Sequence, residues 1–105
     1  MKKSRLQWQS EQELKWHCLQ YNAKQQYINR YPKTEQARRY AQDIDRIETA
    51  LHLTTDAGTY EFLKKHVIFQ NMPYERLGAV PIGRRQFYNL RQKFFNTLMR
   101  LRYDK

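Results

Sequence analysis

Apolar residues recur at three- and four-residue steps along most of the chain, which is the spacing of one face of an α-helix. The clearest repeat comprises Ala37, Tyr40, Ala41, Ile44, Ile47, Ala50 and Leu51. Thr34 precedes it and is a residue type favoured at the N-cap. A second repeat comprises Phe87, Leu90, Phe94, Leu98 and Leu101, widened by Phe95 and Met99. These patterns predict one helix after Thr34 and a C-terminal helix from Gly83 to about Tyr103.

Weaker patterns predict three further helices. Ser10 followed by Glu13 has the spacing of a capping box, so a helix is expected from about Glu11 to about Arg30, before Pro32. Thr54-Thr55-Asp56 is expected to cap a helix that ends near Asn71, and a short helix is expected between Pro73 and Pro81. No segment reads as a β-strand. The sequence therefore predicts an all-α fold of about five helices.

Several single residues are assigned to packing. We expect Trp8, Trp16 and Cys18 to contribute to the core, and His17, His52 and His66 to be surface or capping residues rather than metal ligands. The apolar stripe of the last helix is expected to pack against the N-terminal helices of its own chain. Its spacing also fits a short heptad pattern, so a dimer seam is the alternative.

Charge adds information about partners. The 105 residues carry 20 Lys plus Arg and 10 Asp plus Glu, which is +10 at pH 7. Residues 74–105 hold a net +6 of that excess. This length predicts a single domain over 1–105. We expect residues of about 10–70 to form a helical support or oligomerisation part, and residues of about 73–103 to face an anionic partner.

Composition also argues against several classes of protein. No apolar run approaches the roughly 20 residues of a membrane span, and no apolar stretch follows the basic start as in a secretory signal. The single cysteine fits a reducing, cytoplasmic compartment. No metal-ligand spacing, phosphate-binding glycine loop or nucleophile–base pattern is found, so we expect neither an enzyme nor a cofactor or metal site.

The segment from Met72 to Tyr88 has the order of a helix-turn-helix: a short helix, a turn, and a second helix that opens with Arg84-Arg85. Arginine can read guanine, Asn and Gln can read adenine, and basic residues can also bind phosphate. The predicted double-stranded DNA-binding residues are Arg84, Arg85, Gln86, Tyr88, Asn89, Arg91, Gln92 and Lys93, with Arg100 as a further phosphate contact. In this arrangement the helical hairpin of the N-terminal part supports the helix-turn-helix.

Three runs carry a resemblance: Pro73-Tyr74-Glu75, Ile82-Gly83-Arg84-Arg85-Gln86-Phe87-Tyr88 and Arg91-Gln92-Lys93-Phe94-Phe95. Over about residues 60–100 the chain resembles small phage-encoded transcriptional regulators of the ArpU and RinA type, which have a helix-turn-helix like that of sigma-factor region 4. The resemblance implies sequence-specific binding of double-stranded DNA, regulation of phage late genes, no cofactor, and location in the host cytoplasm.

Two other functions remain open at this point. A small terminase subunit also combines a helix-turn-helix with an oligomerising helical part and binds packaging-site DNA. Alternatively, a basic, aromatic-rich helical surface can bind an acidic patch on host RNA polymerase or its sigma factor. A homodimer is plausible for the regulator, because one recognition helix rarely gives enough specific affinity.

Overall fold

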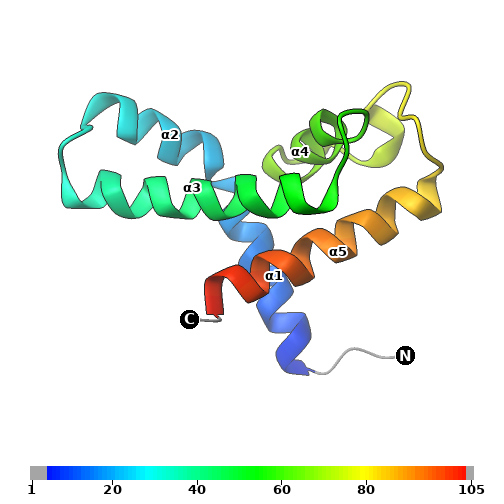
Figure 1. The fold of residues 1–105 in the computed structure, drawn as a ribbon, viewed down its shortest axis with the longest axis horizontal. Coiled ribbons are helices and arrows are strands. Elements are labelled where there is room, and N and C mark those ends of the chain that lie inside the picture. Colours follow the sequence, from blue (N-terminus) through cyan, green and yellow to red (C-terminus); the bar gives the residue numbers. More distant parts are fainter. Residues whose placement is uncertain (1–4, 104–105) are drawn as a thin grey trace.

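The chain folds into five α-helices and one 3-10 turn in a computed structural model, which describes residues 5–103 and the side chains of residues 11–103. The elements are α1 (Arg5–Leu19), α2 (Tyr21–Arg30), α3 (Glu35–Thr54), α4 (Tyr60–Ile68), the 3-10 turn η1 (Tyr74–Arg76) and α5 (Arg84–Tyr103). No strand occurs among the described residues, which confirms the all-α prediction. Figure 1 shows α2 lying along α3 as a hairpin, with α5 running diagonally below α3 and α1 crossing α5.

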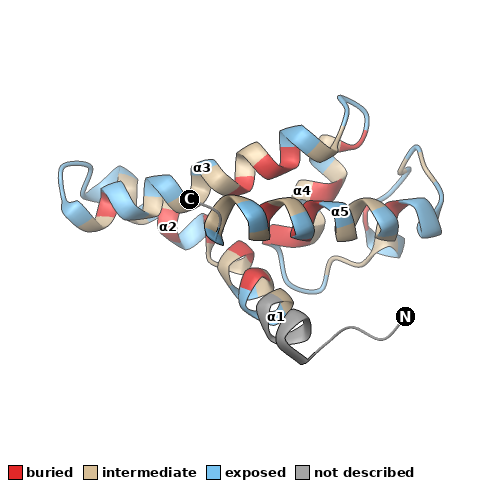
Figure 2. Cartoon of the chain, turned by 60° about the horizontal axis from the view of Figure 1, so that its bottom comes forward, coloured by how far each residue is buried: buried red, intermediate tan, exposed pale blue. Residues whose placement is uncertain are grey.

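The two strongest sequence patterns are confirmed. Thr34 caps α3, because its Oγ1 accepts a hydrogen bond from the Ala37 backbone N–H at 3.1 Å. The final helix spans Arg84–Tyr103, close to the expected range. In both helices the apolar stripe faces the core, except that Ala41 of α3 is exposed, and exposed residues occupy the opposite side of the helix (Figure 2).

The expected helix from Glu11 to Arg30 is wrong in two respects. It begins at Arg5, so Ser10 lies inside the helix and is not its N-cap. It also breaks at Gln20, whose backbone N–H donates to the His17 carbonyl at 3.2 Å in a tight turn. Cys18 before the break and Tyr21 after it are both buried in the core, and the Tyr21 hydroxyl also donates to Glu48 of α3. No glycine or proline marks this position in the sequence.

The expected cap at residues 54–56 is also displaced. Thr54 is the last residue of α3, and α4 begins only at Tyr60. Asp56 instead organises the turn between them, since its Oδ1 accepts from the Gly58 N–H at 3.0 Å and from the Thr59 N–H at 3.0 Å. Thr59 is buried by this turn. The helix therefore starts three residues later than a cap at Asp56 implies.

The short helix expected between Pro73 and Pro81 is not an α-helix. Residues Tyr74–Arg76 form a single 3-10 turn, and the chain then reverses at Gly78, whose φ is 92°. The Tyr74 hydroxyl donates to the Ile82 carbonyl at 2.7 Å and closes this loop in front of α5. The structure therefore lacks the supporting α-helix that a helix-turn-helix requires at these residues.

One core joins the helices. Its fully buried members are Leu14 and Cys18 of α1, Ala50 and Leu51 of α3, Leu63 of α4, and Phe87, Phe94 and Leu98 of α5. This confirms that the stripe of the last helix packs within its own chain, and these side chains are not available for a dimer seam. Trp16 is 60% exposed, so its assignment to the core was wrong, and the side chain of Trp8 lies outside the described residues.

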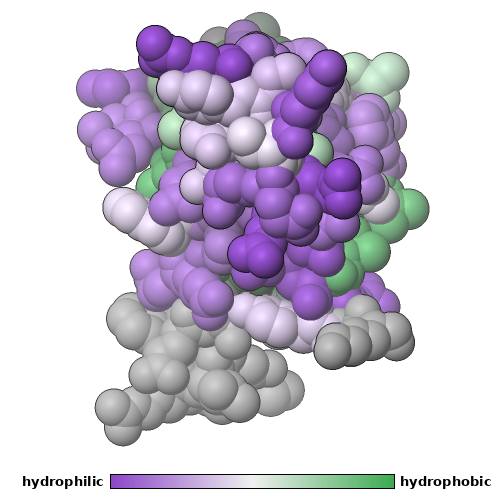
Figure 3. Space-filling model, turned by 90° about the vertical axis from the view of Figure 1, so that its left-hand side faces the viewer, coloured by the Kyte–Doolittle hydropathy of each residue, from purple (hydrophilic) through white to green (hydrophobic). Residues whose placement is uncertain are grey.

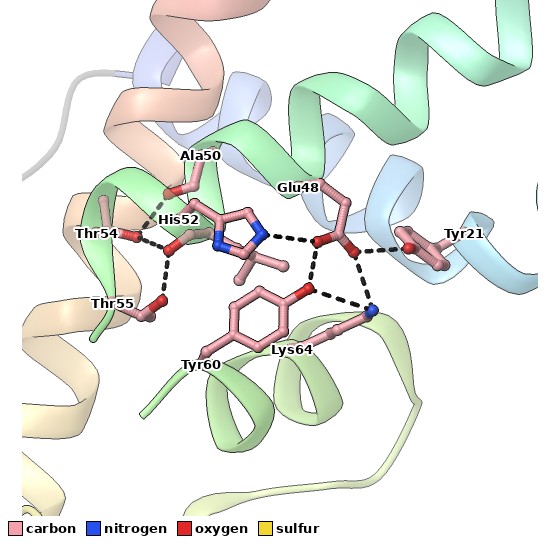
Figure 4. Close-up of polar contacts among 9 residues, drawn as sticks. Tyr21, Glu48, Ala50, His52, Thr54, Thr55, Tyr60 and Lys64 are labelled. Carbon is pink, nitrogen blue, oxygen red and sulfur yellow. Dashed lines mark hydrogen bonds and ion pairs between the residues drawn. The ribbon is translucent and has the colours of Figure 1, made fainter. Parts of the chain in front are cut away.

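A carboxylate, Glu48 of α3, connects three helices (Figure 4). Its Oε1 accepts from the Tyr21 hydroxyl of α2 at 2.6 Å and from Lys64 Nζ of α4 at 2.9 Å. Its Oε2 accepts from the Tyr60 hydroxyl and lies 3.6 Å from His52 Nε2. Burial alone raises the pKa of Glu48, but hydrogen bonds from the two tyrosines and Lys64 outweigh it and lower the pKa.

The Glu48 contacts predict a pH-dependent contribution to stability. Because the pKa is lowered on folding, this contribution is present above the ordinary pKa of about 4.5 and disappears as the pH falls through the lower folded value. We expect Glu48→Gln to reduce the free energy of unfolding by about 1–3 kcal/mol near pH 7, with the difference from wild type shrinking in acid. Glu61→Gln, the same change at an exposed position of α4, is the control, and urea titrations across pH provide the measurement.

Gly78 predicts a second stability effect. An added Cβ meets no atom within 4 Å there, so the positive φ is the sole obstacle to a side chain. We expect Gly78→Ala to cost about 1–2 kcal/mol of unfolding free energy from backbone strain. Gly58→Ala is the control, since its φ is ordinary and its nearest contact is 3.5 Å, and we expect it to be neutral or slightly stabilising. Equal thermal shifts for both variants would contradict this assignment.

Candidate nucleic-acid interface

Helix α5 carries six basic side chains and no acidic side chain over its 20 residues. Its buried side is fixed by Phe87, Phe94 and Leu98, so the opposite side is directed to solvent. Successive residues of a helix are rotated by about 100°. The exposed residues that share this outer side are Arg85, Gln86, Asn89, Lys93, Asn96 and Arg100, which we call the α5 polar face.

The α5 polar face includes four of the eight predicted DNA-binding residues: Arg85, Gln86, Asn89 and Lys93. Each of these side chains is exposed, and Arg85 makes no hydrogen bond or ion pair with another described residue. Gln86 Oε1 accepts from the Gly83 backbone N–H at 3.4 Å, at the start of the helix. These four residues follow helical spacing, so they present cations and amides in one row.

Arg84 is exposed but already has partners. Its Nε donates to Glu75 Oε1 at 2.8 Å, and its guanidinium lies 5.0 Å from the centre of the Tyr88 ring. A hydrogen bond from the Glu75 backbone and the contact with Arg84 lower the pKa of this carboxyl. Glu75 therefore partly neutralises the first arginine of the pair that defined the predicted recognition helix.

The remaining three predicted residues lie away from the α5 polar face. Tyr88 is half-buried and meets the rings of Phe87 and His66 edge-on, at 5.8 and 5.7 Å between ring centres. Gln92 Nε2 donates to Glu11 Oε1 of α1 at 2.8 Å. Arg91 stacks on Phe95, 5.0 Å from its ring centre, and burial lowers its pKa. Tyr88 and Gln92 thus connect α5 to α4 and α1, and Arg91 is held against a neighbouring turn of α5 itself.

The structure also adds residues to the predicted set. Asn96 lies seven residues after Asn89 and three after Lys93, so it falls on the same exposed side of the helix. The three- and four-residue helical spacing in the sequence was the signal that could have identified it. Arg100 extends the same row, as expected for a phosphate contact. Shallow hollows run beside the row, one of about 370 Å³ lined by Leu53 and Thr54 of α3 together with Lys93, Asn96 and Arg100.

The other half of the molecule offers a different surface. Figure 3 looks at the end where α2 and α3 join, and that end is largely hydrophilic. Within the hairpin, Lys24 is buried and donates to Asp43 Oδ2 at 2.9 Å, while Arg46 approaches the other oxygen of Asp43. Asp43 is therefore a partner of two basic side chains. Positive charge is matched by carboxylates inside the hairpin, whereas α5 has none of its own.

No alternative chemical centre is found in the described residues. No group of three His, Cys, Asp or Glu side chains there is arranged to hold a metal ion. His66 is half-buried with its Nδ1 2.7 Å from the Met72 carbonyl, His52 is exposed and stacks on Tyr60, and His17 Nδ1 lies 3.3 Å from Lys24 Nζ. No helix among the described residues is long and apolar enough to cross a membrane.

Comparisons with known proteins add no assignment. No protein-family model, curated protein or solved structure matches this chain.

The burial of Cys18 predicts that its thiol has a packing role and does not react as a nucleophile in the folded protein. The side chain is fully buried, and burial raises the pKa of the thiol to about 12. Since the thiolate is the reactive form, we expect labelling by a disulfide reagent to be slow in the native protein even at mildly alkaline pH. Labelling rates measured against urea concentration should follow global unfolding. Rapid labelling of the folded protein would contradict this assignment.

Proposed function

We propose that this chain is a sequence-specific double-stranded DNA-binding protein that uses the α5 polar face. The observation that carries the proposal is the row of exposed cations and amides on a helix with no acidic residue. Arg85 and Lys93 are suited to phosphate or guanine contacts, and Gln86 and Asn89 have the donor and acceptor pairs that match adenine. The row follows one rigid helix, which is the kind of element that enters a major groove.

The geometry favours duplex DNA over double-stranded RNA. The major groove of B-form DNA admits an α-helix, whereas that of A-form RNA is too narrow for side chains to read. Burial of Phe87, Phe94 and Leu98 fixes the rotation of α5, so the polar row does not need a ligand to become ordered. The proposal does not depend on a supporting helix before α5, since the 3-10 turn and its loop occupy that place.

A regulatory role is part of the same proposal. The resemblance to phage transcriptional regulators of the ArpU and RinA type rests on residues that include Arg85, Gln86 and Lys93, and these are exposed on the α5 polar face. Selection of bound sequences from random duplexes would identify the DNA site. Its position relative to a promoter or a packaging origin would then separate a regulator from a small terminase-like protein.

Matched charge variants test DNA binding through the α5 polar face. We expect Arg85→Gln with Lys93→Gln to weaken duplex binding strongly and to reduce the slope of log affinity against log salt by about 1 for each phosphate that is no longer neutralised. Arg38→Gln with Arg39→Gln removes the same charge from exposed positions of α3 and serves as the control. Fluorescence anisotropy with a labelled duplex measures both. Equal weakening in the two double variants would show that only total charge matters and would contradict the proposal.

A further inference from the structure

A separate hollow of about 720 Å³ lies between α1, the end of α4, the following loop and α5. Its lining includes Trp16, His66, Phe69, Met72, Arg91 and Phe95. Arg91 and Phe95 lie on the side of α5 away from Asn89 and Lys93, because residues two apart on a helix point in different directions. The hollow is therefore distinct from the α5 polar face, and a duplex seated on that face does not cover it.

Two large apolar side chains are left exposed at this hollow. Trp16 is 60% exposed and Phe69 is 45% exposed, although they come from different parts of the chain and line the same concavity. Exposed apolar groups gathered around a concave surface are typical of protein interaction sites, and Trp and Arg are enriched among residues that dominate binding energy. The fold gives Trp16 no core position, so most of its ring is open to a partner.

Arg91 supplies a cation within the same lining. Its guanidinium stacks on Phe95, and burial lowers its pKa, so the charged group has given up part of its hydration. Glu11 of α1 is near enough to raise the pKa of Arg91, but no hydrogen bond or ion pair joins the two described side chains. The described lining of the hollow contains two cations, Lys15 and Arg91, and no acidic residue. A planar guanidinium in this state is suited to a carboxylate, which accepts two parallel hydrogen bonds.

We propose that this hollow binds a segment of a partner protein that carries an aromatic or long aliphatic anchor beside an Asp or Glu. The anchor packs between Trp16 and Phe69, and the carboxylate meets Arg91. Charge complementarity excludes a second copy of this chain as the preferred occupant, because each copy carries +10. A nucleic acid strand fits less well, since a strand needs a row of cations along its length and the described lining offers only Lys15 and Arg91 among apolar and uncharged polar side chains. This proposal does not depend on DNA binding.

Short labelled peptides test the proposal directly. The first probes are acidic decapeptides that differ only in their central residue, which is Trp, Phe, Leu or Met. The second set is matched but has Lys in place of each Asp or Glu, and a labelled oligothymidine is the third probe. We expect at least one acidic peptide to bind the full chain saturably and the Lys-containing peptides not to bind. Arg91→Gln and Trp16→Ala should each weaken the acidic peptide about tenfold, as expected when one charge-assisted or aromatic interaction is removed.

Two control variants locate the effect. Arg100→Gln removes a cation from the α5 polar face, and Leu53→Ala removes a side chain that is 67% exposed on α3, so neither should change peptide affinity. Trp16 is exposed, so Trp16→Ala tests the site even if Arg91→Gln lowers stability. The proposal is overturned if no acidic peptide binds, or if the control variants weaken peptide binding as much as the Trp16 and Arg91 variants do. It is also overturned if oligothymidine binds the wild-type chain more tightly than the acidic peptides do and loses affinity for the Trp16 and Arg91 variants.

Discussion

Burial of one side of α5 is the interaction on which the rest of this structure depends. Phe87, Phe94 and Leu98 have no exposed surface, and they pack in the same core as residues of α1, α3 and α4. Each large apolar side chain contributes about 1.5–3 kcal/mol when it leaves water. Because three such residues follow one stripe, they fix both the position and the rotation of the helix. The outward direction of Arg85, Asn89 and Lys93 is a consequence of this packing.

The distribution of carboxylates then decides where positive charge remains. Glu48 joins α2, α3 and α4 through tyrosine hydroxyls and Lys64, and Asp43 neutralises the buried Lys24. These acids are used inside the helical scaffold, where an unpaired buried charge would be costly. Helix α5 has no carboxylate of its own; Glu75 on the preceding turn lies beside its first arginine, and Glu11 of α1 accepts from Gln92. The α5 polar face therefore carries Arg85, Lys93 and Arg100 with no acidic residue among its members.

The two sides of α5 differ in chemistry. The α5 polar face combines cations with amides and is open to solvent, which suits a large, hydrated polyanion such as duplex DNA. The opposite flank places Arg91 against Phe95 beside the exposed Trp16, which suits a compact group that is both apolar and acidic. One rigid helix between two such surfaces can hold DNA and a protein segment at a fixed separation.

The sequence by itself determined the all-α class, the cap at Thr34, the extent of α5 and the positions of Arg85, Gln86, Asn89 and Lys93 along one side. These follow from local periodicity, which a single helix expresses without its neighbours. Only the tertiary structure decided the break at Gln20, the 3-10 turn in place of a helix after Pro73, the exposure of Trp16 and the inward role of Arg91. Each depends on contacts between segments distant in sequence, and such contacts override weak local preferences because burial contributes more free energy than propensity.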